Sequence, residues 1–435
     1  MRCVPKNVVL LAILSMCDAT ATFCPTASCG RRLQSPSPGL FMAKKLKKKG
    51  GRKKAAVSGG LKGFGSSTPK SATSSGAAGA AKIDRSKPSL AFYDYLEKNG
   101  AGDNLKRVAL AHFPIGDFDL RGVVALRDIK KGDPIIDVPY ELAINLGRES
   151  SDPTLPAVTL LQEYCRWKVG APSKRVRDDG LYFQMLPSYM GSDSLGSTDF
   201  FSDEAMNALQ CPPIKDETFR RREQTVARFE RDIEPMTQIS DNMYRWNEDG
   251  TAVDETHLRW AAWLVTSRVL TVQGEGGSST TYRLMIPLID MCNHDRSSPH
   301  VLTGRAAPGG RLRILAGRNV NAGEQINICY GGGVAGNDRF IQDYGFLDTF
   351  DDGTAFDMVA KMLTGTGGRA GFGGGGHGSM SNSDKAATLE AMQATTLEED
   401  EAALDAAKEG DIRAALAFRI GMKKALERTK SGVGQ

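Results

Sequence analysis

Short apolar runs with strand-like alternation stand at both ends of a long helical stretch, and this order restricts the fold more than any other feature of the sequence. Val123–Leu126 and Ile135–Val138 are rich in β-branched residues and flank the turn Lys130–Asp133. From about Leu155 to Leu270 the apolar residues recur with helical spacing. Alternation returns in the sequences RLRILAG and EQINICYGG. Such an order predicts an α+β fold in which short β-sheets are interrupted by a helical insert, at about residues 150–257.

The first helical pattern indicates where the folded part begins. In the sequence SLAFYDYLEKNGA, the residues Phe92, Tyr95 and Leu96 fall on one face of a helix, and the pair NG is a stop signal. We therefore expect the folded part to begin near Pro88. The chain has 435 residues, which is long enough for two or three domains and at least one large core.

Two later patterns place polar groups on apolar faces. Trp260, Trp263, Leu264 and Ser267 recur at i, i+3, i+4 and i+7, which predicts a helix with one buried face. In EQINICYGG, Tyr330 shares a strand face with the isoleucines two and four residues before it. Since a buried phenol needs a hydrogen-bond partner, we expect one for the Tyr330 hydroxyl.

The sequence predicts a helical C-terminal lobe over residues 350–435. The sequence TLEE, Thr396–Glu399, fits a capping box. The glycine-rich stretch 365–378 lacks the GK[ST] of a phosphate-binding loop, so we interpret it as a flexible insert, with His377 a solvated loop residue. A broad apolar face follows on the last helix, at Ile412, Ala415, Leu416, Phe418, Met422 and Leu426.

Residues 1–22 have the pattern of a targeting signal. Arg2 and Lys6 precede the apolar run Val8–Met16, which is too short to span a membrane. Ala19 and Ala21 fit the small-residue rule of a secretory cleavage site. We therefore expect residues up to about 22 to be removed.

Residues 23–87 are basic and of low complexity, as in a transit peptide. With Phe23 directly after the expected cut, the leader resembles the bipartite plastid leader of algae with secondary plastids, which implies a plastid stroma location. A plain signal peptide followed by a disordered segment stays open. If translation starts at Met42, the basic run resembles a nuclear signal, and the location becomes nucleus or cytoplasm.

The net charge of +5 comes from that basic segment. Lys44–Lys54 holds eight basic residues and no acid, so the rest of the chain has a net charge of about −3 (5 − 8). A nucleic-acid-binding domain normally carries its basic face in the folded region. We therefore expect no nucleic-acid partner for the mature domain, although a nucleic-acid-associated protein that uses the basic segment stays open. The apolar run being short, we expect no membrane span.

The cysteines argue against a disulfide framework and a structural zinc site. None of the eight forms a CxxC pair, and four fall in the first 29 residues. A reducing environment is the natural inference. The cysteines are Cys3, Cys17, Cys24, Cys29, Cys165, Cys211, Cys292 and Cys329.

The stretch LIDMCNHDRSSPH, Leu288–His300, gathers polar residues after an apolar run. Its two histidines, His294 and His300, do not have zinc-ligand spacing, and asparagine is a poor zinc ligand. We therefore predict no metal site. Taken alone, the stretch fits a core histidine with no chemical role.

Several segments in order, however, resemble SET-domain protein-lysine methyltransferases, in the subfamily similar to the Rubisco large-subunit methyltransferase. LIDMCNH resembles the Asn-His motif of that family. LRGVVALRDIKKGDPIIDVP is similar to its first strand pair, and WLVTSRVL to its Ser-Arg helix. GEQINICYGGGVAGNDRFIQDYGFLD resembles its tyrosine strand and the segments that follow. The resemblance covers about residues 88–430, with the expected SET domain at 88–349.

The resemblance implies a SET domain of short sheets with a knot, and transfer of a methyl group from S-adenosylmethionine to a lysine of a protein substrate. A lysine has a pKa of about 10.4, and a dry channel beside the sulfonium cation favours its neutral, reactive form. No strong base is then needed, and alignment of the groups supplies much of the rate. Polarised methyl hydrogens can meet phenol or carbonyl oxygens.

The resemblance also implies the site residues. Tyr330 matches the catalytic tyrosine at the channel and the cofactor. Asn293 and His294 match the cofactor-binding knot, in which His294 is a structural hydrogen-bonder rather than a base. The family loop that approaches the cofactor usually reads Gly-x-Gly, and this chain has only the second glycine. The matching loop residues are Leu120, Arg121 and Gly122, and the substrate-binding positions are Ser267, Arg268, Asp290 and Tyr344.

Rival interpretations stay open at this stage. Tyr330 and Tyr344 could be packing residues, and the Ser267–Asp290 group a structural polar network. A protein-histidine methyltransferase of the same family or a non-catalytic SET-like scaffold would carry the same motifs. With the plastid leader, the resemblance implies an abundant stromal substrate, such as the large subunit of Rubisco or a plastid aldolase.

Overall fold

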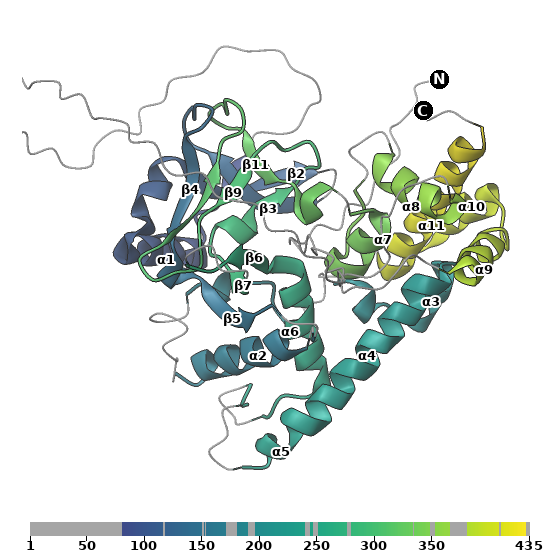
Figure 1. The fold of residues 1–435 in the computed structure, drawn as a ribbon, viewed down its shortest axis with the longest axis horizontal. Coiled ribbons are helices and arrows are strands. Elements are labelled where there is room, and N and C mark those ends of the chain that lie inside the picture. Colours follow the sequence, from purple (N-terminus) through teal and green to yellow (C-terminus); the bar gives the residue numbers. More distant parts are fainter. Residues whose placement is uncertain are drawn as a thin grey trace, which may run out of the picture. The chain divides into compact units, whose positions relative to one another are not determined.

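The computed structural model describes residues 81–431, except 116–117, 150–151, 153, 171–180, 190–195, 240–243, 247–250, 276–279, 334, 349–352, 366–380 and 409. The signal-like segment 1–22, the transit-like segment up to residue 80 and residues 366–378 of the glycine-rich insert, with His377, lie outside the described residues. Figure 1 shows the described elements in sequence colours.

Three small sheets carry the strands, which confirms the α+β prediction. A five-stranded sheet has the order β1-β2-β3-β11-β8, and two three-stranded sheets have the orders β4-β10-β9 and β5-β7-β6. Each sheet therefore joins strands that precede and follow the helical insert (Figure 1). The strands are β1 (Lys82–Ile83), β2 (Val108–Ile115), β3 (Phe118–Ala125), β4 (Pro134–Pro139), β5 (Ile144–Arg148), β6 (Leu270–Gln273), β7 (Thr281–Met285), β8 (Asn293–His294), β9 (Val301–Thr303), β10 (Arg311–Leu315) and β11 (Gln325–Ile328).

The helices fall mainly between β5 and β6 and after β11. The α-helices are α1 (Lys87–Leu96), α2 (Leu155–Lys168), α3 (Asp203–Ala208), α4 (Pro212–Asp232), α5 (Glu234–Thr237), α6 (Glu255–Arg268), α7 (Asn337–Arg339), α8 (Thr354–Thr364), α9 (Asn382–Met392), α10 (Leu397–Ala406) and α11 (Gly410–Lys430). The short 3₁₀- and π-helices are η1 (Glu97–Ala101), η2 (Gly102–Lys106), η3 (Tyr140–Leu142), η4 (Phe183–Met185), η5 (Thr198–Phe200), η7 (Ile289–Met291), η8 (Tyr330–Gly333) and η9 (Phe340–Tyr344).

The fold begins a few residues before the expected start at Pro88. β1 pairs antiparallel with β2, with Lys82 opposite His112. The buried Asp84 accepts a hydrogen bond from the Ser89 hydroxyl at 2.6 Å, in the first turn of α1. This short edge strand was missed because two residues carry no periodic pattern. Residues 82–84 therefore already contact the folded part, ahead of the expected start at Pro88.

The expected helical faces are confirmed. In α1, Phe92, Tyr95 and Leu96 are buried. In α6, the tryptophans and the two residues that share their face are buried as well. α10 begins with the expected capping box, in which Thr396 accepts from the Glu399 amide. Tertiary packing of these faces, rather than intrinsic propensity, supplies most of the stability of such helices.

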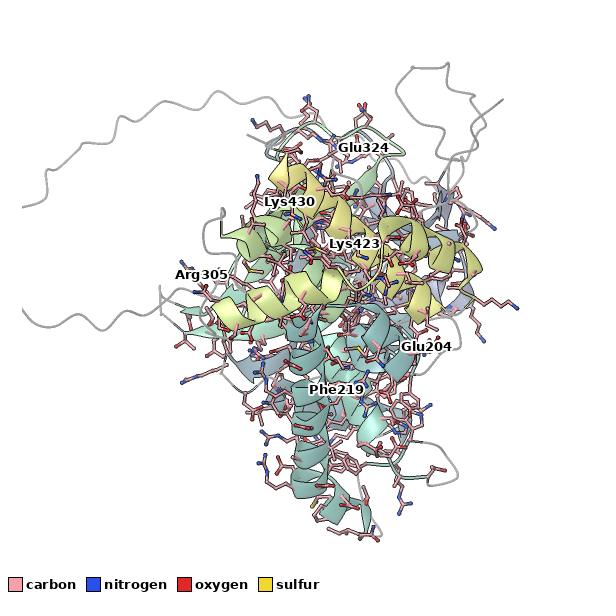
Figure 2. The ribbon with its side chains drawn as sticks, turned by 90° about the vertical axis from the view of Figure 1, so that its right-hand side faces the viewer. Glu204, Phe219, Arg305, Glu324, Lys423 and Lys430 are labelled. Carbon is pink, nitrogen blue, oxygen red and sulfur yellow. The ribbon has the colours of Figure 1, made fainter. Side chains whose placement is uncertain are left out.

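Two hydrophobic cores divide the described residues differently from the expected domain boundaries. The first core lies among the three sheets and the helices α1, α2 and α6. The second contains α8, α9 and α11 together with α3 and the first turn of α4. Part of the insert expected at 150–257 thus packs into the C-terminal lobe. Figure 2 shows α11 with Lys423 and α4 with Phe219 from the lobe side.

Buried ion pairs join the parts of this lobe. Asp400 of α10 lies 2.7 Å from Arg419 Nη2 and 2.6 Å from Lys423 Nζ, both on α11. Arg419 also donates to the Ala208 carbonyl at the end of α3, at 3.0 Å. The contact between α3 and α11 spans about half the sequence and has no local signal, which explains why the sequence did not predict it.

Candidate active site

The Asn-His segment lies as a short strand next to the end of β11. β8 pairs in parallel with β11, with Asn293 opposite Asn327 and His294 opposite Ile328. Before it, Leu288 has φ +70°, an unfavourable backbone conformation for a bulky residue. Such strain costs about 1–3 kcal/mol and is concentrated at functional sites. The sequence therefore holds this segment in a costly conformation beside β11.

Tyr330 is the buried centre of the site. Its side chain is 1% exposed, and its hydroxyl donates to the Cys292 carbonyl at 2.5 Å. Its backbone N–H donates to His294 Nδ1 at 3.0 Å. β11 ends at Ile328, so Tyr330 lies in η8 rather than in the expected strand. The expected burial and the hydroxyl partner are nevertheless both present, because η8 continues inward from the strand.

His294 has its ring nitrogens in two different contacts. Nδ1 accepts from the Tyr330 amide, and Nε2 lies 3.4 Å from Asp348 Oδ2. Burial opposes ionisation of Asp348, but the contact with His294 and the charge of Arg296 hold its pKa below the usual value. An imidazole that accepts at Nδ1 carries its proton on Nε2, towards the carboxylate. His294 therefore supports Tyr330 by accepting a hydrogen bond from its backbone amide.

Tyr344 packs flat on Tyr330. The ring centroids are 5.4 Å apart with an interplanar angle of 20°. Phe340 and Phe346 contact Tyr344 at centroid distances of 5.5 and 5.8 Å. Offset stacking of this kind contributes about 0.5–1.5 kcal/mol beyond area burial. The structure thus brings the two predicted tyrosines together inside one aromatic group.

Leu120, Arg121 and Gly122 lie in β3, and the expectation that they form a loop is wrong. β2 and β3 pair antiparallel over their whole length, from Val108 opposite Ala125 to Ile115 opposite Phe118. Leu120 is partly exposed and pairs with Phe113. The Arg121 carbonyl accepts from Asn293 Nδ2 at 3.2 Å. The structure therefore brings Arg121 to the Asn-His segment and leaves Leu120 at the rim.

Gly122 lies where a side chain would not fit. A Cβ atom there would be 2.5 Å from Asn293 Nδ2 and 2.8 Å from Gln325 Nε2. Among the described residues, Gln325 Nε2 and Asn327 Oδ1 are buried without a hydrogen-bond partner. Buried polar atoms are normally paired, so these two are placed to contact a polar group. Of the Gly-x-Gly pattern that the resemblance implies, this chain has only Gly122, and Gly122 is the residue that Asn293 and Gln325 approach closely.

Arg268 and Asp290 form a buried polar cluster with Tyr182, which we call the Arg268 cluster, and the buried Ser267 precedes Arg268 on α6. Arg268 Nη1 donates to Asp290 Oδ2 at 3.1 Å and to the Asp290 carbonyl at 3.2 Å. Tyr182 donates its hydroxyl to the same Oδ2 at 2.5 Å. Within the described part of the chain, Asp290 Oδ1, Ser267 Oγ and Arg268 Nε have no partner. The cluster is therefore only partly satisfied.

Burial shifts the ionisation of this cluster. It raises the pKa of Asp290, against the opposing effect of the Arg268 charge and the Tyr182 hydrogen bond. It lowers the pKa of Arg121, which the neighbouring Arg268 charge lowers further. It also raises the pKa of Tyr330 well above its ordinary value. The Tyr330 phenol is therefore un-ionised at neutral pH and acts as a hydrogen-bonding group, not as a phenolate base.

Sequence reasoning missed Tyr182 and Asp348. Tyr182 lies in η4's N-terminal flank and reaches Asp290 across 108 residues, with no motif around it. Asp348 closes the segment that starts at Asn337, since the Asn337 side chain donates to its carbonyl at 3.0 Å. The sequence FLD was part of the resemblance, and its aspartate was the available signal for Asp348.

The described residues contain neither a membrane-spanning helix nor a group of metal ligands. No helix there is long and apolar enough for a bilayer crossing. No group of three or more histidine, cysteine, aspartate or glutamate side chains is placed there to hold a metal ion.

Comparison with known proteins agrees with this arrangement. Residues 120–331 match the SET domain family. The chain carries a SET domain. The matched part includes every predicted site residue except Tyr344, which follows it. The resemblance seen in the motifs is thus confirmed at the level of the domain.

Two curated relatives align with parts of this SET-domain chain. The actin-histidine N-methyltransferase of Canis lupus familiaris is 39% identical over 105 residues, which is 24% of the chain and 16% of that protein. The chloroplastic ribulose-1,5-bisphosphate carboxylase/oxygenase large subunit N-methyltransferase of Pisum sativum is 24% identical over 256 residues, 55% of the chain and 48% of that protein. The chain thus spans less than half the length of either relative.

A solved structure shares the fold. The SET domain of LSMT bound to lysine and AdoHcy superposes with a TM-score of 0.52 and 18% sequence identity, covering 80% of the chain and 91% of that structure. At this identity the likeness shows the SET-domain fold with its helical additions.

Proposed function

We propose that the chain is an S-adenosylmethionine-dependent protein-lysine N-methyltransferase. The observation that carries the proposal is Tyr330. Its phenol is buried and un-ionised, it is held at its hydroxyl and its backbone amide, and it lies between the Asn-His segment and Tyr344. Groups fixed in this way align reactants without donating or taking a proton, which is what methyl transfer to a neutral amine requires.

The residues present fit the cofactor. Asn293, the backbone of Arg121 and Gly122, and His294 would hold it, with the unpaired Gln325 Nε2 and Asn327 Oδ1 available for its polar groups. Bound there, S-adenosylmethionine supplies a methyl group activated by the sulfonium charge. The absence of a side chain at Gly122 lets Asn293 and Gln325 approach the strand closely. Tyr330 and the Cys292 carbonyl offer oxygen atoms that methyl hydrogens can meet.

The Arg268 cluster fits the amine. Ser267 Oγ and Asp290 Oδ1 are buried acceptors whose capacity is unused among the described residues. A lysine nitrogen there can donate to them and keep its lone pair for the methyl group. Burial and the positive charges of Arg121 and Arg268 disfavour the charged form of the lysine amine, so the amine enters as the neutral base. Tyr344 forms a wall on the other side of Tyr330.

The proposed substrate is a lysine on an abundant stromal protein, with the Rubisco large subunit or a plastid aldolase as the first candidates. Support comes from the similarity to the pea enzyme, whose name states the Rubisco large subunit, and from the plastid-like leader. The lysine must lie on a mobile segment or a terminus to reach a buried site. We place the enzyme in the plastid stroma on the same two grounds, with nucleus or cytoplasm as the alternative if translation starts at Met42.

Histidine methylation is the second candidate. The alignment with the actin-histidine enzyme has the higher identity, although it covers only 24% of the chain. A neutral imidazole at the Arg268 cluster could donate one N–H to Asp290 Oδ1 and present its other nitrogen. The two candidates differ in the product amino acid and not in the cofactor.

The test is incubation of the full chain with stromal extract and methyl-labelled S-adenosylmethionine, followed by hydrolysis of the labelled protein and amino-acid analysis. Label in methyl-lysine of a stromal protein supports the proposal. Label in methyl-histidine selects the second candidate. Binding of S-adenosylmethionine without transfer to any protein points to a non-catalytic scaffold and overturns both.

A further inference from the structure

The element that delivers Tyr344 to the site has an unusual backbone. η9 is a π-helical turn, Phe340–Tyr344, and it ends at Gly345 in the left-handed conformation, φ +81°. Such turns are rare and occur frequently at functional sites. Asn337 closes the segment at its base, since its Oδ1 accepts from the Asp348 amide at 2.7 Å. The middle of the segment needs a separate support.

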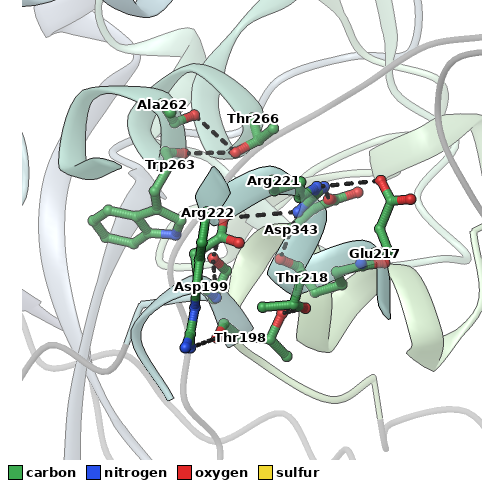
Figure 3. A network of polar contacts seen from close by, with 12 residues as sticks. Thr198, Asp199, Glu217, Thr218, Arg221, Arg222, Ala262, Trp263, Thr266 and Asp343 are labelled. Atoms are coloured by element: carbon green, nitrogen blue, oxygen red, sulfur yellow. Dashed lines mark hydrogen bonds and ion pairs between the residues drawn. The ribbon is translucent and has the colours of Figure 1, made fainter. Parts of the chain in front are cut away.

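Arg221 of α4 supplies that support. Its Nη1 donates to the Gln342 carbonyl at 3.3 Å, and its Nη2 pairs with Asp343. Further contacts run from Nε to Glu217 at 3.5 Å and from Nη1 to Asp199 at 3.8 Å. Figure 3 shows the Arg221 guanidinium among Asp343, Glu217 and Asp199. A side chain of the helical insert thus reaches the residue before Tyr344.

Asp343 has a cation on each oxygen. Arg221 pairs with Oδ1, and Arg339 lies 2.6 Å from Oδ2. Asp343 is 3% exposed, so solvent screens these pairs little. Two guanidinium groups on one buried carboxylate fix its position and hence the backbone of η9. We call Arg221, Asp199, Glu217, Asp343 and Arg339 the Arg221 cluster.

We infer that Arg221 is a positioning residue that holds Tyr344 against Tyr330 and so sets the width of the amine channel. Only one residue separates the bonded Gln342 from Tyr344, and the stack between the tyrosines is 5.4 Å. A displacement of about 1 Å at a reacting group can lower a rate by about 100-fold. The inference rests on the proposed function, because the channel is the one through which the lysine would enter.

Arg228 offers a matched control on the same helix. Its side chain is 14% exposed, against 15% for Arg221, and it also pairs with carboxylates, namely Asp152 and Asp232. Neither carboxylate belongs to η9. Arg221→Lys and Arg228→Lys both keep the charge and remove the planar fork that binds two groups at once. Any difference between the two variants then reports on η9.

Hydrogen exchange tests the positioning without any activity. Arg221→Lys should raise the exchange rate of amides 340–346 by about tenfold, and Arg228→Lys should leave it unchanged. Asp343→Asn, made in parallel, should act like Arg221→Lys. Equal rates in all variants, or equal increases in the two lysine variants, would overturn the inference. If neither Arg221→Lys nor Asp343→Asn folds, the cluster is a requirement of the fold and the positioning role is also overturned.

Kinetics then tests the consequence for the channel. Arg221→Lys should raise KM for the protein substrate by about tenfold, while the Kd for S-adenosylmethionine stays within about twofold and Arg228→Lys changes neither. A loss of cofactor binding in Arg221→Lys would contradict the inference. If the unsubstituted chain transfers no methyl group, the proposed function fails, and the exchange rates alone decide whether Arg221 positions η9.

Discussion

Asp343 of the Arg221 cluster and Asp290 of the Arg268 cluster are both buried carboxylates with arginine partners, and they differ in how completely they are paired. Asp343 has a guanidinium on each oxygen. Asp290 has Arg268 and Tyr182 on one oxygen, and its other oxygen has no partner among the described residues. Since buried polar groups are normally satisfied, the fully paired Asp343 fits a structural role and Asp290, with one oxygen unpaired, fits a binding role.

Burial raises the pKa of Asp290, which the charges of Arg268 and Arg121 and the Tyr182 hydrogen bond only partly offset. Burial raises the pKa of Asp199 in the Arg221 cluster as well. Tyr182 and Arg268 both approach Asp290 Oδ2, and Oδ1 has no partner among the described residues. A buried carboxylate is therefore assigned to the site by its unused oxygen together with its place in the motif, and not by its burial alone.

Removing the cation of the Arg268 cluster should give the largest effect. Arg268→Met leaves Asp290 buried without a counter-charge, which should lower the free energy of unfolding at pH 7 by about 3–5 kcal/mol. The deficit should shrink at acid pH, where the carboxyl is protonated. Chemical denaturation at both pH values measures it. Arg318→Met, at an exposed pair with Glu324, should cost less than about 1 kcal/mol; an equal loss would contradict the burial argument.

At a buried carboxyl outside both clusters, Asp338, removal of the charge should instead raise the free energy of unfolding at pH 7. Burial raises the pKa of Asp338 from 3.8 to about 6. The folded state then binds the Asp338 proton more tightly than the unfolded state. Protonation of Asp338 therefore adds stability that is fully present below pH 3.8 and is lost as the pH rises through about 6. Asp338→Asn should therefore stabilise the chain by about 1–3 kcal/mol at pH 7 and not at pH 3.5. Unfolding curves with no pH-dependent difference would refute this.

The Asn-His segment should give an effect on cofactor binding alone. Asn293→Ala removes the hydrogen bond to the Arg121 carbonyl and should raise the Kd for S-adenosylmethionine by about tenfold, or about 1.4 kcal/mol. Isothermal titration calorimetry measures the change. Asn319→Ala, at a surface asparagine bonded to Lys131, is the control and should have no effect. A similar Kd for both variants would remove Asn293 from the cofactor site.

The smallest effect concerns the phenol in the Arg268 cluster. The Tyr182 hydroxyl stabilises the ionised form of Asp290, so Tyr182→Phe should raise the pKa of Asp290 further. If the carboxylate orients the amine, the acid limb of the kcat/KM profile should move up by about one pH unit or less. Tyr140→Phe, which loses only a contact with Asn145, should not move it. An unshifted limb in Tyr182→Phe would separate Tyr182 from the site.

The sequence predicted those features that local periodicity encodes. Runs of β-branched residues identified β3 and β4, and alternation identified β10 and β11 and placed Tyr330 inward with its isoleucines. Helical spacing identified the buried faces of α1 and α6. The motif resemblance grouped Arg268 of α6 with Asp290 of η7, and the two are hydrogen-bonded.

The features that the sequence did not predict depend on long-range contacts. Tyr182 meets Asp290 across 108 residues, and Arg221 meets Asp343 across 122. Neither Tyr182 nor Arg221 belongs to a motif. Since arginine and tyrosine are also common on protein surfaces, their presence in the helical insert did not predict a buried contact. The packing of α3 into the C-terminal lobe was not predicted for the same reason, since it depends on contacts with the distant α11, such as that of Arg419 with the Ala208 carbonyl.

The central claim is that Tyr330 aligns the reactants of methyl transfer, and Tyr330→Phe tests it most directly. The phenylalanine ring keeps the stack on Tyr344 but loses the hydroxyl bonded to Cys292. Single-turnover transfer should fall by about 100-fold or more, with the Kd for S-adenosylmethionine within about twofold of the unsubstituted chain. An unchanged transfer rate would contradict the claim and make Tyr330 a packing residue.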